Sequence, residues 1–243
     1  NFIVNAPELW SPENPSLYKA VSKIYADNKL VDTYTTRFGI RSIEYIADKG
    51  FYLNGKHRKF QGVCNHHDLG PLGAAINVAA LRHQLTLLKD MGCDAIRTSH
   101  NMPTPELVAL CDEMGFMMMI EPFDEWDIAK CENGYHRYFN EWAERDMVNM
   151  LHNYRNNPCV VMWSIGNEEW ALEGNERGLR ITKSMSEYVH QLDSTRLSTQ
   201  GTAGGRVSLF GVDVKGYNYL RQNPIDEFHQ KHPEWYSPVG SEE

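Results

Sequence analysis

The sequence predicts an α/β fold: a (β/α)8 TIM barrel that lacks its last βα unit and follows the end of an all-β domain. From residue 59 onward, short apolar runs alternate with helical patterns, which is typical of repeated βα units around a parallel sheet. No glycine-rich phosphate loop follows an early strand, as a doubly wound sheet would more often show. With 243 residues, 42% of them hydrophobic, the chain is long enough for one packed barrel.

The first 49 residues have the pattern of antiparallel β-structure. Residues 17–25 alternate polar and apolar, Asp27-Asn28 predicts a turn, and residues 31–34 predict a second strand. Fewer than 50 residues cannot close a sandwich, so we interpret them as the last strands of a domain whose start is absent. Asn54-Gly55 predicts another hairpin, which we expect to cap the barrel. We therefore divide the chain into residues 1–49 and a barrel domain of residues 50–243.

The barrel region contains recognisable helices between the predicted strands. Leu81, Leu85 and Leu88 share one helical face before Gly92, and Thr104-Pro105 begins a helix that ends at Gly115. Two longer amphipathic helices are predicted near residues 138–156 and 175–192. Seven apolar runs are the predicted parallel strands: residues 60–63, 95–97, 117–121, 160–165, 197–200, 212–217 and 238–240.

Composition narrows the class of partner. The formal charge is 24 − 32 = −8 and no Lys/Arg cluster is present, so we expect neither nucleic acid nor an anionic membrane as a partner. The five cysteines are odd in number and widely spaced, which favours buried free thiols over a disulfide framework or a zinc site. No signal-like or membrane-spanning apolar segment is present, so we expect a soluble protein and leave its compartment open, cytoplasmic or periplasmic. The abrupt ends suggest a piece of a longer protein.

Polar side chains gather just after the predicted strands. Asn167-Glu168-Glu169 follows the apolar run at residues 159–162, and the carboxyl ends of barrel strands are where catalytic groups lie. Tyrosines and Trp126 or Trp163 beside such groups suit a sugar, which has apolar faces and hydroxyl edges. Carboxylates after the fourth and seventh strands can face each other at about 5–5.5 Å, as a retaining glycosidase requires. The polar groups in question are residues 65–68, 97–101, 121, 124–127, 167–169, 217–219 and 242–243.

These strand ends resemble glycoside hydrolase family 2, and most closely its β-galactosidases. The resemblance rests on Gly166-Asn167-Glu168, Arg97-Thr98-Ser99-His100, Gly240-Ser241-Glu242 and the segment Gly62 to Asp68. It implies the end of an immunoglobulin-like sandwich followed by a catalytic barrel. It also implies Glu168 as general acid/base and Glu242 as nucleophile. We expect substrate contacts from His66, Asp68, Arg97, His100, Trp126, Asn167, which binds the sugar 2-hydroxyl, and Tyr219, near the nucleophile.

The expected activity is a retaining exo-β-glycosidase acting on terminal β-D-galactosides, with a carbohydrate as the partner. A β-glucuronidase of the same family and a non-catalytic carbohydrate-binding fragment are the alternatives. We expect little activity from residues 1–243 alone, because an open seven-stranded barrel leaves unpaired strand edges. We also expect the full-length protein to be a homo-oligomer.

Several residues admit a second interpretation. No cofactor is required, but Glu125 matches a position that holds magnesium in some relatives, although Asp127 stands where a histidine ligand would be. His66, His67, Asp68 and His100 could form a metal cluster, but the expected His-X-His pair and further histidines at strands five and six are missing. Arg97 could pair with Asp68 or Glu121 and simply hold the barrel top. We expect the remaining histidines, at positions 57, 83, 136, 152, 190, 229 and 232, to be surface residues.

Overall fold

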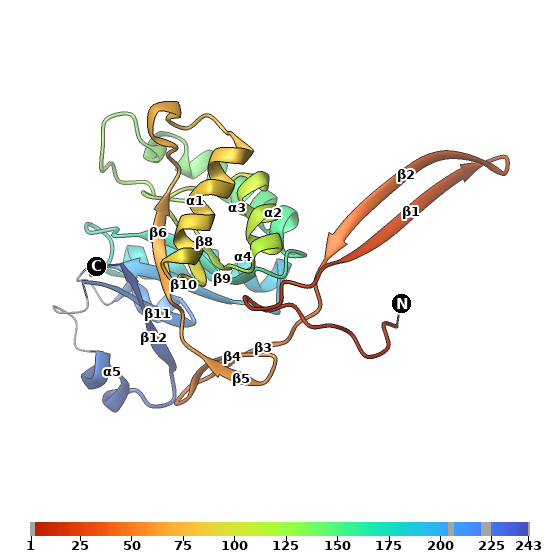
Figure 1. Ribbon diagram of the computed structural model, residues 1–243. Coiled ribbons are helices and arrows are strands. Elements are labelled where there is room, and N and C mark those ends of the chain that lie inside the picture. Colours follow the sequence, from red (N-terminus) through yellow and green to blue (C-terminus); the bar gives the residue numbers. More distant parts are fainter. Residues whose placement is uncertain (1–2, 204–206, 220–224, 243) are drawn as a thin grey trace.

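The computed structural model describes residues 3–203, 207–219 and 225–242, and it is built around one parallel sheet of seven strands (Figure 1). The strands lie in chain order from β6 to β12, as in a barrel that winds in one direction. All seven predicted strands are confirmed. They are β6 Gly62–His66, β7 Ala95–Ser99, β8 Met117–Ile120, β9 Val160–Asn167, β10 Leu197–Thr202, β11 Val214–Asn218 and β12 Tyr236–Glu242.

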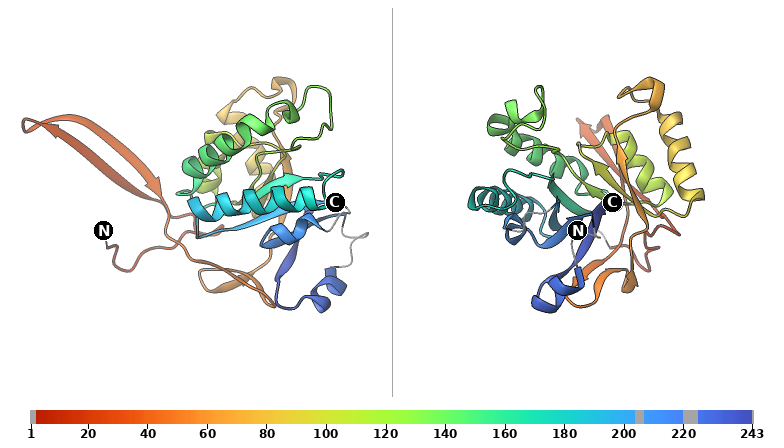
Figure 2. Two further views of the ribbon diagram at one scale, coloured as in Figure 1. Left: turned by 180° about the vertical axis from the view of Figure 1, so that it is seen from behind. Right: turned by 90° about the vertical axis from the view of Figure 1, so that its left-hand side faces the viewer.

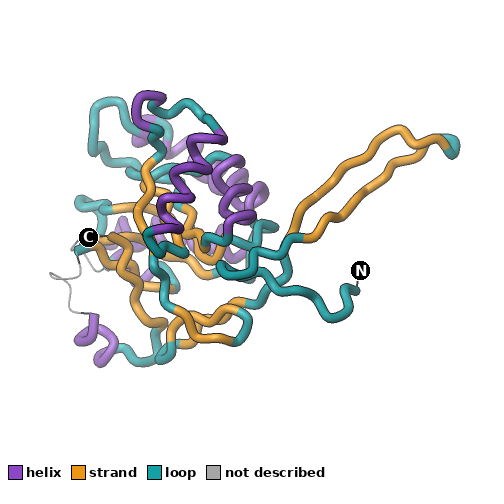
Figure 3. The backbone as a smooth tube through the Cα atoms, viewed as in Figure 1, coloured by secondary structure: helices purple, strands orange, loops and turns teal. Residues whose placement is uncertain are grey.

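Helices cover the outer face of this curved sheet (Figure 2). The four predicted helices are confirmed, and a short fifth one follows β11; they are α1 Val78–Asp90, α2 Pro105–Met114, α3 Phe139–Tyr154, α4 Glu176–Leu192 and α5 Ile225–Lys231. The side chain of Thr104 accepts a hydrogen bond from Leu107 N at the start of α2, and Gly115 ends that helix at φ 75°. Figure 3 shows the helical layer lying on one side of the strands.

The strand β9 is mostly apolar because it is buried on both faces. Every residue of β9 is buried, because its outer face meets helices and its inner face meets the barrel interior. The strand ends in polar residues where it reaches the mouth: Asn167 is 3% exposed and the following Glu168 is 6% exposed. The fold therefore delivers an amide and a carboxylate to the open end of a mostly apolar strand.

Two hairpins precede the barrel. β1 Tyr18–Ala26 and β2 Lys29–Phe38 pair antiparallel around Asp27 and Asn28, both at positive φ, and the hairpin projects away from the body (Figure 1). β3 Ile43–Ile46, β4 Gly50–Leu53 and β5 Lys56–Arg58 form a separate sheet with a turn at Asn54-Gly55, also at positive φ. This small sheet includes strands on both sides of residue 49, so the predicted domain boundary falls within it.

The sheet β3–β4–β5 closes the N-terminal end of the barrel, as predicted. The hydroxyl of Tyr45 donates to Val161 O of β9 at 2.6 Å, and Phe51 and Leu53 of β4 are buried in the core. Trp10, which is fully buried, donates from Nε1 to Asp112 O at 2.9 Å. The arm before the barrel is thus tied to the closed end of the barrel and leaves the opposite end open.

Two further expectations can be compared with the fold. All five cysteines are free thiols, and three of them, Cys93, Cys111 and Cys159, are buried, whereas Cys131 is exposed. Within the described ranges, no helix is both long and apolar enough to cross a bilayer.

Candidate active site

A buried ion pair organises the mouth of the barrel. Arg97, in the middle of β7, donates to Glu121 Oε2 from Nη2 at 2.8 Å and from Nε at 3.1 Å. Nη2 also donates to Asn167 Oδ1 at 2.9 Å. Burial alone would lower the pKa of Arg97, but the Glu121 carboxylate outweighs it and holds that pKa above its usual value. Of the two partners predicted for an ion pair with Arg97, the structure selects Glu121 and not Asp68.

Glu121 is the hub of this network, and it is fully buried. Besides Arg97, it contacts His100 Nδ1 at 2.7 Å and accepts a hydrogen bond from the Ser164 hydroxyl of β9. The ring of His100 in turn meets the ring of His66 edge to face, with centroids 5.3 Å apart. The structure therefore brings together His66, Arg97 and His100, as expected, around a carboxylate to which the sequence assigned only a structural part.

A second amide, Asn218 at the end of β11, joins the network to the acid/base candidate. Its Nδ2 donates to Glu168 Oε1 at 2.9 Å and to Asn167 Oδ1 at 3.1 Å. Asn218 is fully buried. Sequence reasoning placed it among the polar strand-end residues but gave it no role, and the only signal was an amide at a strand terminus. Its position makes it the group that orients the Glu168 carboxylate.

Glu168 has an unusual backbone. Its φ is 46°, in the left-handed region, which costs a non-glycine residue about 1–2 kcal/mol. Its N–H donates to Gly201 O of β10 at 2.9 Å, which fixes this conformation. Tyr219, also at positive φ, follows Asn218 and is half-buried. Backbone strain of this kind concentrates at functional sites, so its presence at two strand ends supports the location of the site.

The nucleophile candidate Glu242 ends β12, and its Cα is paired with that of Asn218 in the sheet. Its backbone therefore arrives next to the strand whose last amide binds Glu168. The side chain of Glu242, and the whole of Glu243, lie outside the described residues, so the separation of the two carboxylates stays a prediction.

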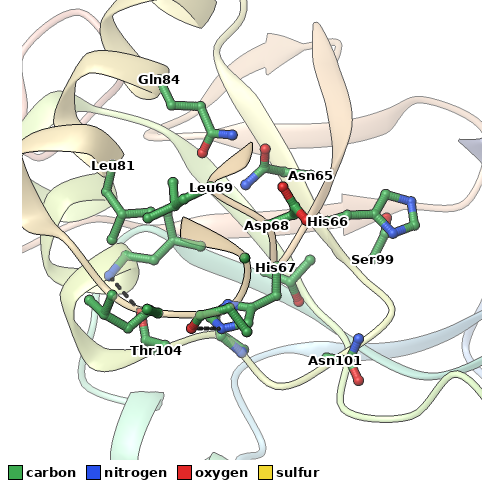
Figure 4. Close-up of a pocket in the computed structure, with 17 residues that line it drawn as sticks. Asn65, His66, His67, Asp68, Leu69, Leu81, Gln84, Ser99, Asn101 and Thr104 are labelled. Carbon is green, nitrogen blue, oxygen red and sulfur yellow. Dashed lines mark hydrogen bonds between the residues drawn. The ribbon is translucent and has the colours of Figure 1, made fainter. Parts of the chain in front are cut away.

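Asp68 and the adjoining loop lie beside a small hollow (Figure 4). Asp68 is exposed, and its Oδ1 accepts a hydrogen bond from Gly70 N at 2.6 Å, within its own loop. The hollow between this loop, α1 and the start of α2 measures about 20 Å³, room for about one water. Asp68 thus stabilises a turn here, and the structure does not join it to the Arg97–Glu121 pair.

Trp126 occupies a different place from the one expected. It is fully buried, and its Nε1 donates to Ile165 O of β9 at 2.9 Å. A Cβ on Gly166 would come within 2.6 Å of the same Nε1, so the indole packs tightly against the strand. Trp126 therefore supports β9 and has no exposed ring face for stacking on a sugar, contrary to the sequence interpretation. Trp170, which sequence reasoning passed over, is 70% exposed and follows the Glu168-Glu169 pair.

The donors around Glu125 do not fit a magnesium site. Glu125 is 2% exposed; Oε1 accepts from His136 N at 2.9 Å and contacts His136 Nδ1 at 2.9 Å, while Oε2 accepts from Lys130 N at 2.6 Å. Asp127, in the place of a second ligand, forms an ion pair with Arg177. Among the described residues, no group of three or more His, Cys, Asp and Glu side chains could hold a metal ion. Both Glu125 oxygens are already bonded, so they are poorly available to a cation.

The same contacts explain the pKa of Glu125 and show that His136 is not a surface residue. Burial would raise the pKa of Glu125, but hydrogen bonds from the backbone N–H groups of His136 and Lys130 hold it below its usual value. His136 was expected to be a surface residue. It is instead only 22% exposed and lies against Glu125.

Glu169 contrasts with its neighbour Glu168. It is 3% exposed, and its Oε1 has no hydrogen-bond partner among the described residues. Burial raises the pKa of Glu169 to about 8, although the nearby Lys130 opposes the change. The two adjacent carboxyl groups therefore occupy different surroundings.

Comparisons with known proteins agree with this architecture. The family model described as glycosyl hydrolases family 2, TIM barrel domain, matches residues 45–239, and that described as glycosyl hydrolases family 2 matches residues 1–41. Beta-galactosidase BoGH2A of Bacteroides ovatus is 43% identical over 251 residues, covering 89% of this chain and 30% of the relative. A putative beta-glucuronidase of Formosa agariphila is 38% identical over 88% of this chain and 20% of its own length.

Solved structures give the same picture. A glycosyl hydrolase family 2 member from Bacteroides cellulosilyticus matches with a TM-score of 0.88 and 38% identity, covering 94% of this chain and 30% of that chain. The chain thus spans less than a third of the length of these relatives.

Proposed function

This chain belongs to glycosyl hydrolase family 2, and from that premise we propose that it carries the catalytic centre of a retaining exo-β-glycosidase. The observation that supports this most strongly is the chain of contacts at the mouth, from Glu121 through Arg97 and Asn167 to Asn218 and Glu168. A carboxyl group held at a strained strand end by a buried amide is what an acid/base catalyst needs, because geometry must be set before the proton moves.

In the proposed reaction, Glu242 attacks the anomeric carbon and forms a glycosyl-enzyme intermediate. Glu168 first protonates the departing glycosidic oxygen and then takes a proton from the water that hydrolyses the intermediate. Asn218 keeps the Glu168 carboxylate turned toward the mouth. The atoms balance, since water supplies the hydroxyl of the released sugar and the proton that returns to Glu168.

Asn167 fits the role of a donor to the sugar. Its Oδ1 already accepts from Arg97 at 2.9 Å and from Asn218 at 3.1 Å, which determines how its amide is turned. Among the described residues, its Nδ2 makes only a long contact, 3.5 Å, with Asp124 Oδ1. The amide N–H₂ is therefore the part of Asn167 directed to a substrate, where the 2-hydroxyl of the sugar would accept.

We infer a β-galactoside as the substrate, with a β-glucuronide as the alternative. A glucuronide carries a carboxylate, which is recognised best by an arginine or lysine that is not already committed. In the described part of the mouth, Arg97 is paired with Glu121, and Lys130 donates to Asp124 and to the Asn167 carbonyl. A beta-galactosidase at 43% identity supports the same choice.

The test is hydrolysis of aryl β-galactoside, β-glucuronide, β-glucoside and β-mannoside by the full-length protein and by Glu242→Gln. We expect selective cleavage of the galactoside, which the substitution abolishes. Cleavage of the glucuronide instead would establish the alternative sugar. Cleavage of none, with sugar binding retained, would support the non-catalytic carbohydrate-binding alternative.

A further inference from the structure

The loop between β8 and α3 returns one lysine to the acid/base strand. The Nζ of Lys130 donates to the carbonyl oxygen of Asn167 at 2.6 Å, to the carbonyl oxygen of Asp124, and to Asp124 Oδ1 at 3.2 Å. An ammonium has three N–H donors, and these three oxygens use all of them. The side chain is 21% exposed. Lys130 is therefore a fixed, mostly buried cation.

The Asn167 contact has a specific consequence for the peptide bond between Asn167 and Glu168. The carbonyl of that peptide is held by Lys130, and its N–H donates to Gly201 O at 2.9 Å. Both the carbonyl and the N–H of this peptide are thus hydrogen-bonded, the first to Lys130 and the second to Gly201. The orientation of this plane sets φ of Glu168 at 46°, a value the residue would leave if the plane could turn.

The groups around Lys130 show why a lysine suits this position. Four carboxyl groups lie in or near the loop; Glu125 accepts hydrogen bonds from His136 N and Lys130 N, and Asp127 is paired with Arg177. Asp124 contacts Lys130 directly, and Glu169 is close enough for Lys130 to affect its titration. Carbonyl and carboxylate oxygens around a cation could equally describe a magnesium site, but here the chain supplies the cation.

We propose that Lys130 is a positioning residue that holds the Asn167–Glu168 peptide for acid/base catalysis, and that it makes a divalent ion unnecessary there. The proposal rests on the proposed function of Glu168. Without the ammonium, the peptide plane is bound at one end only, and the Glu168 carboxyl moves away from the departing oxygen. The loss falls on substrates whose leaving group needs a proton, and spares those whose leaving group departs unaided.

The experiment compares full-length wild type, Lys130→Met, Lys130→Arg and the control Lys183→Met, which changes an exposed lysine of α4. The rates of hydrolysis are measured on aryl glycosides with good and poor leaving groups, after EDTA treatment and again with MgCl2. We expect wild type to be indifferent to both treatments. Lys130→Met should lose about 10- to 100-fold on poor leaving groups and much less on good ones. Magnesium should not restore it, Lys130→Arg should recover part of the loss, and Lys183→Met should match wild type.

Equal losses on both leaving groups, or wild-type activity that EDTA removes and magnesium restores, would overturn the proposal. Wild type that cleaves no glycoside under any condition would instead mark failure of the proposed function. In that case, calorimetric titration of wild type and Glu125→Gln with MgCl2 still tests whether a magnesium ion binds beside Lys130. We expect the two proteins to give the same titration. Magnesium binding that is present in wild type and lost in Glu125→Gln would contradict Lys130 as the resident cation.

Discussion

Arginine side chains lie at both ends of the barrel sheet, but their hydrogen-bond partners differ. At the mouth, Arg97 donates to the side chains of Glu121 and Asn167. At the closed end, Arg41 donates to the main-chain carbonyls of Pro158 and Val160, at 2.7 and 2.6 Å, and Arg196 also binds Val160 O. Arg41 thus satisfies main-chain carbonyls at the closed end, whereas Arg97 orients other side chains at the mouth.

The titration of the two arginines follows from their partners. Burial and the neighbouring Arg196 lower the pKa of Arg41 to about 10, since no carboxylate among the described residues is directly bonded to it. Glu121 does the opposite for Arg97 and holds its pKa above the usual value despite burial. A charge that lacks a carboxylate can be replaced at modest cost, whereas half of a buried pair cannot. The comparison therefore predicts that equivalent changes at the two ends have different effects.

The largest effect is expected from Arg97→Met. It leaves Glu121 as a buried, uncompensated carboxylate, which should cost about 3–5 kcal/mol of stability, and it releases Asn167, so turnover should be lost. Arg41→Met is the matched variant at the closed end. It removes the guanidinium donor to Pro158 O, whereas Val160 O keeps its bond from Arg196, and it should cost about 1–3 kcal/mol while turnover stays near wild type. Denaturant unfolding and initial rates of the full-length proteins test both, and equal effects would contradict the contrast.

The next effect concerns the buried carboxyl groups at the two ends. The pKa of Glu169 is about 8 in the folded protein, above its ordinary value, so the folded state keeps a proton that the unfolded chain has lost. Stability should therefore fall as pH rises from about 4.5 to 8. Glu169→Gln should remove this fall and stabilise the protein at pH 8, on the order of a few kcal/mol.

Asp112 is the control for this change, at the closed end. Burial raises the pKa of Asp112 too, but its carboxylate accepts from Cys159 N at 3.0 Å and from Asn157 Nδ2 at 2.6 Å. Asp112→Asn should therefore destabilise at pH 8, because it places an amide opposite two donors. Unfolding midpoints between pH 5 and 9 distinguish the variants, and a Glu169→Gln curve parallel to wild type would refute the assignment.

A smaller effect is expected from replacing one glycine at each end by alanine. A Cβ on Gly201 would lie 2.7 Å from Arg97 Nη2 and 3.2 Å from Asn167 Oδ1. Gly201→Ala should lower kcat/KM by about 10- to 100-fold with a stability loss of about 1–3 kcal/mol. A Cβ on Gly39 would lie 2.5 Å from Pro158 Cγ, so Gly39→Ala should show a similar stability loss with normal turnover. Steady-state kinetics and thermal unfolding of both variants distinguish an effect on turnover from an effect on stability. An inactive Gly39→Ala would contradict the expectation that the closed end contributes only to stability.

These contrasts also show how far sequence reasoning reaches. The barrel was predictable because local signals coincide: apolar runs such as β9, the Thr104 cap and the Asn54-Gly55 turn each require only a few residues. The position of Glu168 at the mouth was predictable because the apolar run before it fixes where β9 ends. The sequence could not predict whether a side chain in a long loop is buried or exposed, because a loop has no regular alternation of faces. Trp126, which is buried against β9, is an example.

Contacts between distant segments were the other gap. Lys130 and Asn167 are 37 positions apart, and nothing in either segment indicates that an ammonium will meet a carbonyl. Glu121 was visible as a partner for Arg97, but its bonds to His100 and Ser164 depend on how β7, β8 and β9 are aligned. The candidate site residues could be named from the sequence, whereas the residues that contact them required the structure.

The smallest predicted effect tests whether the two ends are independent. Tyr45 donates to Val161 O near the start of β9, and Glu168 follows the end of the same strand, about 20 Å away at about 3.3 Å per residue. Tyr45→Phe removes one hydrogen bond to a carbonyl and should cost about 1 kcal/mol. If β9 is held along its length by β8, β10 and the helices, this loss stays at the closed end and kcat is unchanged. A kcat lowered in proportion to the stability loss would mean that β9 transmits changes to Glu168, and the closed end would then share in positioning the catalyst.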